Sequence, residues 1–382
     1  MTMIAVTGTC GKTPTTYLLK AILEQARGAK VGLIGTNQNM IGSDVIPTER
    51  TTPESFEVQK LFREMADAGC THVVMETSSH ALYLDRVYGV RYDVGIFTNL
   101  TQDHLDFHKT MENYCDAKAI LFRNCVTGVV NADDPWTPRL LKDADCKVMT
   151  YAEQADADLR AENIVLSAGG IAFDAVSGAE RVPIRVNIPG GFMVYNTLDV
   201  LGAALALGIS LEESAVVLAK VPHVKGRVEI VPTPGKDYTI LIDYAHTPDS
   251  MVNVLQTVKE FAKGRTVAVF GCGGDRDRTK RPLMGKAAAD WSDFAVVTTD
   301  NPRTEEPEAI IADILPGFDG SATPYHVVVD RIEAIHWAMD HAEKDDVIVL
   351  CGKGHETYQE VNHVKHHMDE REIVADYLSS GR

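Results

Sequence analysis

The first half of the chain alternates short apolar runs, rich in β-branched residues, with longer stretches whose apolar positions recur at helical spacing. The runs predict strands and the amphipathic stretches predict helices. In chain order, the elements expected here are Met3–Thr7, Thr13–Gln25, Val31–Gly35, Glu54–Asp67, Thr71–Glu76, Asp93–Thr98, Met111–Arg123 and Val126–Asn131. Apolar strands that alternate with helices predict an α/β domain with a mostly parallel sheet covered on both faces.

The pattern changes after this point and then restarts. Residues 157–189 form shorter alternating segments, which predict an antiparallel appendage, and helices are expected at about 194–208 and 211–220. A boundary is expected at Val221–Gly226. Further strands are expected at Tyr238–Asp243, Thr266–Phe270, Phe294–Thr298, Tyr325–Val329 and Val347–Leu350. The sequence therefore predicts two α/β domains, residues 1–222 and 223–382.

Composition and charge narrow the functional classes. The 382 residues suit two domains, and the net charge of −17 without a basic run argues against a nucleic-acid partner. No apolar run approaches the roughly 18 residues of a membrane span, so no membrane association is expected. The seven cysteines are scattered and form no C-x-x-C pair, which indicates a reducing compartment and a cytoplasmic location.

A glycine-containing turn joins the first expected strand to the first expected helix. It reads Gly8-Thr9-Cys10-Gly11-Lys12-Thr13, and Pro14 follows in the first helical turn, where proline is tolerated. In such a turn backbone N–H groups bind phosphate oxygens, the lysine neutralises the outer phosphates and the threonine hydroxyl ligates Mg²⁺. Val6 replaces the first glycine of the strict P-loop pattern, so a plain strand-to-helix turn is the alternative.

Polar residues follow two more of the expected strands. Glu76 ends the strand at Thr71–Glu76, and His104 lies in the loop after Asp93–Thr98. The carboxyl ends of strands in an open α/β sheet converge, so both side chains are expected beside the phosphate loop. A carboxylate and an imidazole there predict a divalent-cation site, although each residue taken singly is also consistent with a hydrogen-bonded loop group.

Charged loops also follow strands of the second half. Arginine binds a carboxylate with two parallel hydrogen bonds and glutamate accepts from an ammonium, so Arg276, Arg303 and Glu356 predict an amino-acid site. The glycines after Thr266–Phe270 lack the G-x-G-x-x-G spacing, which disfavours a dinucleotide cofactor. A histidine cluster near residue 365 is interpreted as a surface segment rather than a metal site.

Together these motifs resemble the Mur ligases, and within them the meso-diaminopimelate-adding tripeptide-synthetase (MurE) type, over essentially the whole chain. The segments that carry the resemblance are Thr7–Thr13, Glu76–His80, Thr98–Leu100, Asp103–Asp106, Asp243–Asp249, Gly271–Asp277, Asp300–Arg303 and Gly352–Glu356. The resemblance implies a central P-loop ATPase-type domain over 1–222 and a C-terminal Rossmann-like, amino-acid-binding domain over 223–382.

The resemblance also assigns roles to individual residues. The turn from Gly8 to Pro14 would bind ATP, and two Mg²⁺ ions would be held by Thr13, Glu76, His104 and Lys118, the last modified by CO₂ to a carbamate. Lys12, Glu76, His104 and Lys118 are the implied catalytic residues. Further nucleotide contacts are implied at Asn196, Arg227, Asp243 and His246. Acyl-donor contacts are implied at Thr51, Thr52, Ser78 and Arg86, and amino-acid contacts at Arg276, Asp300, Asn301, Pro302, Arg303, Gly352 and Glu356.

The sequence departs from the family pattern at several of these places. Cys10 replaces an Asn, Pro14 a Thr, Arg50 the Asn before Thr51, Leu84 a donor-contacting Gln, and Met193 an Asn. The sequence begins at the phosphate-loop strand, so the family's N-terminal UDP-binding domain is expected to be lacking. The identity of the donor is the inference most affected.

The activity implied by the resemblance is ATP-dependent, ADP-forming ligation through an acyl phosphate. It would join an amino acid to an acyl-peptide donor, as in peptidoglycan precursor synthesis. The family motif that contains Arg303 is associated with meso-diaminopimelate, so this amino acid is the one implied. The partners would be small molecules, with a separate chain that supplies donor recognition as a further alternative. The sequence also leaves open a ligase with a UDP-free donor, a folylpolyglutamate-synthase-like enzyme, an inactive binding subunit and a P-loop transport or motor ATPase.

Overall fold

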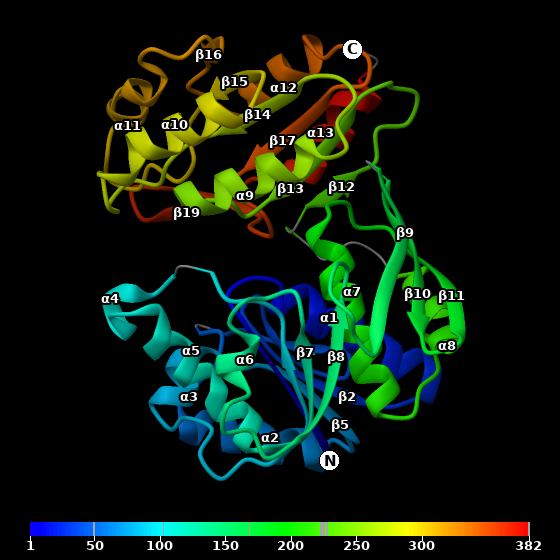
Figure 1. The fold of residues 1–382 in the computed structure, drawn as a ribbon. Helices are drawn as coiled ribbons and strands as arrows, with labels where there is room; N and C mark the ends of the chain where they lie inside the picture. The colour runs from blue at the N-terminus through cyan, green and yellow to red at the C-terminus, as the bar shows by residue number, and fades with distance from the viewer. Residues whose placement is uncertain (49, 102, 168, 222–225, 227, 381–382) are drawn as a thin grey trace. The chain divides into compact units, whose positions relative to one another are not determined.

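The computed structural model describes residues 1–48, 50–101, 103–167, 169–221, 226 and 228–380, and the chain divides into two compact units. Of the described residues, the first unit takes in 1–165, 171–187 and 191–221. The second takes in 166–167, 169–170, 188–190, 226 and 228–380 (Figure 1). The boundary expected between residues 222 and 223 lies outside the described residues.

An eleven-stranded sheet forms the centre of the first unit, in the order β11-β10-β9-β8-β7-β6-β1-β5-β2-β3-β4. Adjacent strands pair in parallel from β8 to β2, and β9 continues this pairing, whereas β2–β3, β3–β4 and β10–β11 are antiparallel. The strands are β1 (Thr2–Thr7), β2 (Val31–Ile34), β3 (Asn39–Ile41), β4 (Asp44–Ile46), β5 (His72–Glu76), β6 (Tyr92–Phe97), β7 (Cys125–Asn131), β8 (Lys147–Ala152), β9 (Leu159–Ser167), β10 (Gly170–Ser177) and β11 (Glu180–Val186).

Helices cover both faces of this sheet. They are α1 (Lys12–Arg27), α2 (Ser55–Asp67), α3 (Ser79–Tyr83), α4 (Leu105–His108), α5 (Met111–Ala119), α6 (Thr137–Leu140), α7 (Phe192–Ala206) and α8 (Leu211–Leu218). Helix α1 packs against α7 and α8, as Figure 1 shows for α1 and α7, while residues of α2, α3 and α5 share a separate apolar core with the strands. The mostly parallel sheet between two helical layers confirms the expected α/β class.

The second unit repeats this architecture on a smaller scale, with a six-stranded sheet in the order β12-β13-β17-β14-β15-β16. All its pairs are parallel except β12–β13. Residues of α9, α10 and α11 share one apolar core with the sheet, and residues of α12 and α13 share another. The elements are β12 (Glu229–Val231), β13 (Thr239–Asp243), α9 (Pro248–Lys259), β14 (Thr266–Phe270), α10 (Lys280–Trp291), β15 (Phe294–Val297), α11 (Pro307–Ile314), β16 (Tyr325–Val327), α12 (Arg331–Asp340), β17 (Val347–Cys351), β18 (Tyr358–Val361), β19 (Val364–His367) and α13 (Glu370–Ser379).

Two sequence expectations need correction. The helix expected over Met111–Arg123 ends at Ala119, and Ile120–Arg123 form a 3-10 turn that places Leu121 and Phe122 in the core. Residues 157–189 are antiparallel only in part: β10 and β11 pair antiparallel as expected, whereas β9 pairs in parallel with β8 and so extends the main sheet. Among the helices of the described ranges, none has the length and apolar character needed to cross a bilayer.

Candidate active site

The phosphate-loop turn lies between the ends of β1 and α1, at the centre of the first sheet. Gly11 caps α1 in a left-handed conformation with φ +88°, and a Cβ atom there would lie 2.2 Å from Oδ1 of Asn196 on α7. The loop is fastened to the end of the neighbouring strand β6. The backbone N–H of Cys10 donates to Asn99 Oδ1 (2.9 Å), and the Thr98 hydroxyl donates to the carbonyl of Cys10 (2.6 Å).

Two lysine amines meet at one carbonyl of this loop. Nζ of Lys12 donates to the carbonyl oxygen of Gly8 at 2.9 Å, and Nζ of Lys118 donates to the same oxygen at 2.8 Å. Lys118 is fully buried on α5, with its Nζ 4.4 Å from the ring centroid of Tyr114. Burial, and then the charge of Lys12, holds the pKa of Lys118 well below the usual 10.5.

Glu76 lies at the carboxyl end of β5, directly beside this loop, and is completely buried. The Thr13 hydroxyl donates to its Oε1 at 2.8 Å, and the Thr36 hydroxyl donates to its Oε2 at 2.7 Å. The hydroxyl of Thr36 in turn lies 3.0 Å from that of Thr51. One hydrogen-bonded chain therefore joins an expected donor contact to two expected metal ligands. Sequence reasoning did not include Thr36.

The remaining expected donor contacts lie beside Glu76. The Thr52 hydroxyl donates to the backbone carbonyl of Glu76 (2.9 Å) and accepts from the N–H of Ser78 (3.0 Å). Arg86 donates to the carbonyl of Thr52 at 3.2 Å and forms an ion pair with Glu54 at 2.9 Å. Its buried Nε has no hydrogen-bond partner among the described residues.

His104 lies in a cluster of rings at the start of α4. It has a left-handed backbone (φ +53°), its Nε2 lies 3.3 Å from Asp103, and its ring contacts those of His80 and Tyr114. Tyr114 connects this cluster to the phosphate loop, because its hydroxyl lies 3.3 Å from that of Thr9. His104 therefore reaches the loop through other side chains.

The oxygen atoms of this first-unit site suit Mg²⁺. Carboxylate and hydroxyl oxygens such as those of Glu76 and Thr13 are its preferred ligands, and Mg²⁺ commonly takes only one or two carboxylates and completes its shell with phosphates and water. Within the ranges that the structure describes, no three His, Cys, Asp or Glu side chains gather as a metal cage. The residues present fit an ion that is held jointly with a nucleotide.

Two polar residues of helix α7 contact the phosphate loop and the first turn of α1. Asn196 faces Gly11, and one turn later the buried carboxyl group of Asp199 accepts from the Thr15 hydroxyl on α1, with oxygen distances of 3.0 and 3.1 Å. Burial raises the pKa of Asp199 well above 3.8. Sequence reasoning missed Asp199, although an acidic residue inside an apolar helix was a readable signal.

In the second unit, the expected nucleotide contacts lie near the end of β13. Asp243 accepts from the N–H groups of Val228 (2.9 Å) and Ala245 (2.8 Å), and so shapes the loop that carries His246. The ring of His246 lies against that of Tyr244, with centroids 4.6 Å apart. Arg227 lies outside the described residues.

The expected amino-acid contacts gather around Asn301 at the end of β15. The Asn301 amide donates to Glu356 Oε2 at 3.0 Å, and its Oδ1 accepts from Nζ of Lys353 at 2.7 Å. Lys353 also donates to Glu356 Oε2 at 2.9 Å and is fully buried. Lys353 lies inside the motif Gly352–Glu356, but the sequence alone predicts no role for it.

The other residues of this group are held by neighbouring loops. Arg303 (φ +52°) donates to the carbonyl of Gly274 at 2.7 Å and pairs with Glu360 at 3.3 Å. The Pro302 carbonyl also approaches Gly274, where a Cβ atom would lie 1.9 Å from its oxygen. A Cβ atom on Gly352 would lie 2.5 Å from Asp300 Oδ2. Arg276 is exposed and donates to the carbonyl of Asp275 at 3.4 Å.

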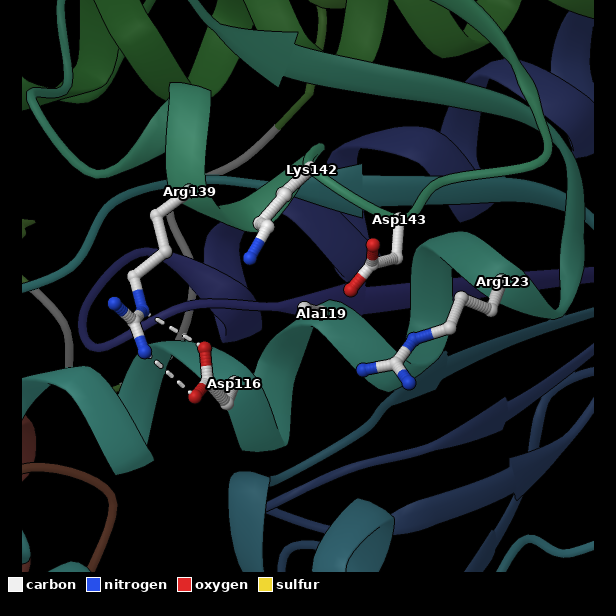
Figure 2. Close-up of a pocket in the computed structure, with 6 residues that line it drawn as sticks. All are labelled: Asp116, Ala119, Arg123, Arg139, Lys142 and Asp143. Atoms are coloured by element: carbon white, nitrogen blue, oxygen red, sulfur yellow. Dashed lines mark hydrogen bonds and ion pairs between the residues drawn. The ribbon is translucent and has the colours of Figure 1, made fainter.

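A surface pocket of about 190 Å³ also borders α5 (Figure 2). Its lining residues are Asp116, Ala119, Arg123, Arg139, Lys142 and Asp143. Arg139 donates to both carboxylate oxygens of Asp116 at 2.8 Å, and this pairing lowers the pKa of Asp116. None of the expected site residues lines the pocket, and Asp116 is exposed although Lys118, two positions on, is buried.

Comparison with known proteins identifies the family. The Mur ligase middle domain matches residues 6–204, and the Mur ligase glutamate ligase domain matches residues 226–354. The chain belongs to the Mur ligase family. This confirms the resemblance seen in the motifs.

Relatives match this Mur ligase along nearly all of its chain. A Clostridium botulinum protein named UDP-N-acetylmuramoyl-L-alanyl-D-glutamate–2,6-diaminopimelate ligase is 50% identical, and the match covers 98% of this chain and 77% of that protein. A Clostridium acetobutylicum protein of the same name, numbered 1, is 51% identical over 98% of this chain and 78% of its own. A solved structure of a ligase of that name is 35% identical, has a TM-score of 0.77, and matches 100% of this chain and 79% of that chain.

Proposed function

We propose that this Mur ligase joins 2,6-diaminopimelate to an acyl-peptide donor, with ATP converted to ADP and phosphate, as a step of peptidoglycan precursor synthesis. The names of its relatives support this substrate pair. The single structural observation that carries the proposal is the convergence of Lys12 and Lys118 on the Gly8 carbonyl, beside the Thr13–Glu76 pair. The activity belongs in the cytoplasm, where ATP is available.

The first domain, residues 1–222, would bind ATP. Backbone N–H groups from Gly8 to Thr13 and the N-terminus of α1 would bind the phosphates, with Pro14 in the first helical turn. Asn196 is a further candidate nucleotide contact in this domain, and Arg227, Asp243 and His246 are the candidate nucleotide contacts in the second domain. Lys12 would neutralise charge that spreads over the outer phosphate during transfer.

Mg²⁺ would neutralise phosphate charge next to the reacting group when it is bound. Thr13 and Glu76 would hold one ion, and His104 with a modified Lys118 would help to hold a second. The low pKa of Lys118 supports its modification by CO₂, because only the unprotonated amine has a lone pair for the attack. The new N–C bond forms with release of one amine proton to solvent, and the product is an N-carboxylate anion, which would pair with the cations of this site.

The reaction would proceed in two displacements. The donor carboxylate, oriented by Thr51, Thr52, Ser78 and Arg86, attacks the γ-phosphorus, and the bond to ADP breaks. The amine of the amino acid then attacks the acyl carbon and loses a proton, an amide bond forms, and phosphate leaves with the electron pair of the broken C–O bond. Positioning and electrostatic stabilisation supply most of the catalysis in such steps.

The second domain, residues 223–382, would supply the amine. Arg276 and Arg303 offer guanidinium groups to carboxylates, Glu356 accepts from an ammonium, and Asp300, Asn301, Pro302 and Gly352 shape the surrounding loops. Diaminopimelate carries a carboxylate at the end where lysine has only an ammonium. Arg303 therefore favours diaminopimelate over lysine.

The test is ADP release by the purified enzyme across a panel of donors and amino acids. The donors are the UDP-linked muramoyl dipeptide, the same peptide without UDP, and a folate, and the amino acids are meso-diaminopimelate, lysine and glutamate. We expect release with the muramoyl dipeptide and diaminopimelate. Equal use of lysine would refute the amino-acid assignment, and release only with the folate would refute the assignment of an acyl-peptide donor.

A further inference from the structure

Two ion pairs lie next to Asn301 in the second unit. Lys353 Nζ lies 2.9 Å from Glu356 Oε2, and Arg303 Nε lies 3.3 Å from Glu360 Oε2. We call Asn301, Arg303, Lys353, Glu356 and Glu360 the Asn301 cluster. Each pair joins one cation to one anion, so the cluster carries no net charge before a substrate arrives.

Asn301 links the two pairs. Its Oδ1 accepts from Lys353 Nζ (2.7 Å) and from the backbone N–H of Glu360 (2.9 Å), while its Nδ2 donates to Glu356 (3.0 Å). Asn301 and Lys353 both donate to Oε2 of Glu356. The other oxygen, Oε1, is therefore left for an incoming ammonium.

Burial distinguishes Lys353 from the other charged members. Its side chain is 0% exposed, against 15% for Glu356, 18% for Arg303 and 20% for Glu360. The cation that balances Glu356 therefore lies within the protein, whereas Arg303, Glu356 and Glu360 are partly exposed and can be reached by a substrate. The buried ammonium of Lys353 can therefore act on a substrate only indirectly, by orienting its neighbours and by changing the electrostatic potential at them.

We propose that Lys353 is a positioning and specificity-determining residue, which fixes Glu356 and balances its charge so that the cluster accepts a zwitterionic amino-acid end. This inference rests on the proposed function and names how the far end of diaminopimelate is selected. That end brings a carboxylate for Arg303 and an ammonium for Glu356 and adds no net charge. A lone ammonium, as in lysine, leaves Arg303 without an anion from the substrate, and a lone carboxylate leaves Glu356 without an ammonium.

Charge-changing variants at the two ends of one ion pair test the proposal. Lys353→Met leaves Glu356 unbalanced and makes the cluster net negative, so the ratio of kcat/KM for diaminopimelate to that for lysine should fall about tenfold. Glu356→Gln leaves Lys353 unbalanced and makes the cluster net positive. The ratio for 2-aminopimelate, which has only the far carboxylate, over lysine should then rise about tenfold.

Lys365→Met is the matched control. Lys365 is an exposed residue of β19, and its Nζ lies 4.0 Å from the ring centroid of Tyr358, the ring that Lys353 approaches at 5.2 Å. Its removal deletes the same charge from the same neighbourhood but not from the cluster. Both substrate ratios should stay at the parent values.

The outcomes distinguish failure of the role proposed for Lys353 from failure of the proposed function. Equal loss with all three substrates in both folded variants would show a merely structural role and overturn the assignment of Lys353. If Lys353→Met fails to fold, the direction of the change in Glu356→Gln decides. A parent enzyme that does not use diaminopimelate would overturn the proposed function itself.

Discussion

Lys12 and Lys118 donate to the same carbonyl oxygen of Gly8, at 2.9 and 2.8 Å, although they come from different helices and lie 106 positions apart in the sequence (118 − 12). Two ammonium groups this close would repel each other, and burial of Lys118 adds to the cost of charging it, so the pKa of Lys118 is low. Conversion of one amine to an anion would replace the repulsion by attraction. The arrangement thus gives a physical reason for the modification of Lys118 that we propose.

Replacement of Lys118 tests this reason. Lys118→Ala should lower ATP turnover at least about 100-fold, because the anion that would help to hold a metal ion beside the reacting phosphates is lost. Added acetate should restore part of the rate, since a small carboxylate can occupy the vacated space. Steady-state ADP release with and without acetate measures both effects. Asp116→Asn on the exposed side of α5 is the control and should keep the parental rate, whereas full activity of Lys118→Ala would refute the role.

The hydroxyl of Thr36 should tune the metal affinity of Glu76. Thr36→Val removes the donor to Glu76 Oε2, and loss of such an outer contact commonly weakens metal binding by about tenfold or more. The Mg²⁺ concentration needed for half-maximal ADP release should rise accordingly. Thr323→Val, which removes a hydroxyl that donates to the carbonyl of Ala289 in the second unit, serves as the control. An unchanged Mg²⁺ requirement in Thr36→Val would contradict the role of this network.

Gly11 and Gly28 separate backbone strain from steric conflict. Both have positive φ, +88° and +60°, but a Cβ atom on Gly11 would meet Asn196 at 2.2 Å, whereas nothing lies within 4 Å at Gly28. Gly28→Ala should cost about 1 kcal/mol of unfolding free energy from the left-handed conformation alone. Gly11→Ala should cost more, on the order of 2–3 kcal/mol, and should also weaken nucleotide binding.

Chemical denaturation and nucleotide titration measure these two effects. The double variant Gly11→Ala/Asn196→Ala removes the obstructing amide and should recover part of the lost stability, because the conflict is between these two side chains. Equal destabilisation by Gly11→Ala and Gly28→Ala would show that the steric conflict with Asn196 does not contribute to the loss of unfolding free energy.

The sequence predicted strands best where both faces of a strand are buried. All five residues of β14 and the last four of β1 are buried, so they appear as continuous apolar runs. The hairpin β18–β19 was missed because Val364–His367 are all exposed and leave no apolar pattern. The histidines at 363, 366 and 367 lie on this exposed hairpin, in agreement with the expectation of a surface segment.

Candidate site residues could be proposed from the sequence where a motif has its own local chemistry, as in the phosphate loop. Lys118 had no such signal: helical spacing alone suggested an exposed lysine, and only the family resemblance marked it. Thr36 and Lys353 were missed because their importance arises from contacts with residues 40 and 52 positions away, Glu76 and Asn301. Contacts of this kind depend on the tertiary fold.

The carboxyl group of Asp199 should make the free energy of unfolding depend on pH. Its pKa is raised by burial in the folded chain, so the folded state retains a proton that the unfolded state releases as pH rises above about 3.8. The free energy of unfolding therefore falls with rising pH over the interval between the unfolded and folded pKa values. Asp199→Asn keeps the shape and an acceptor for Thr15 but removes the titration. The stability of Asp199→Asn relative to the parent should increase as pH is raised from about 4 to 8, measured by denaturant unfolding at each pH. A difference that stays constant over this range would show that Asp199 does not titrate as its burial implies.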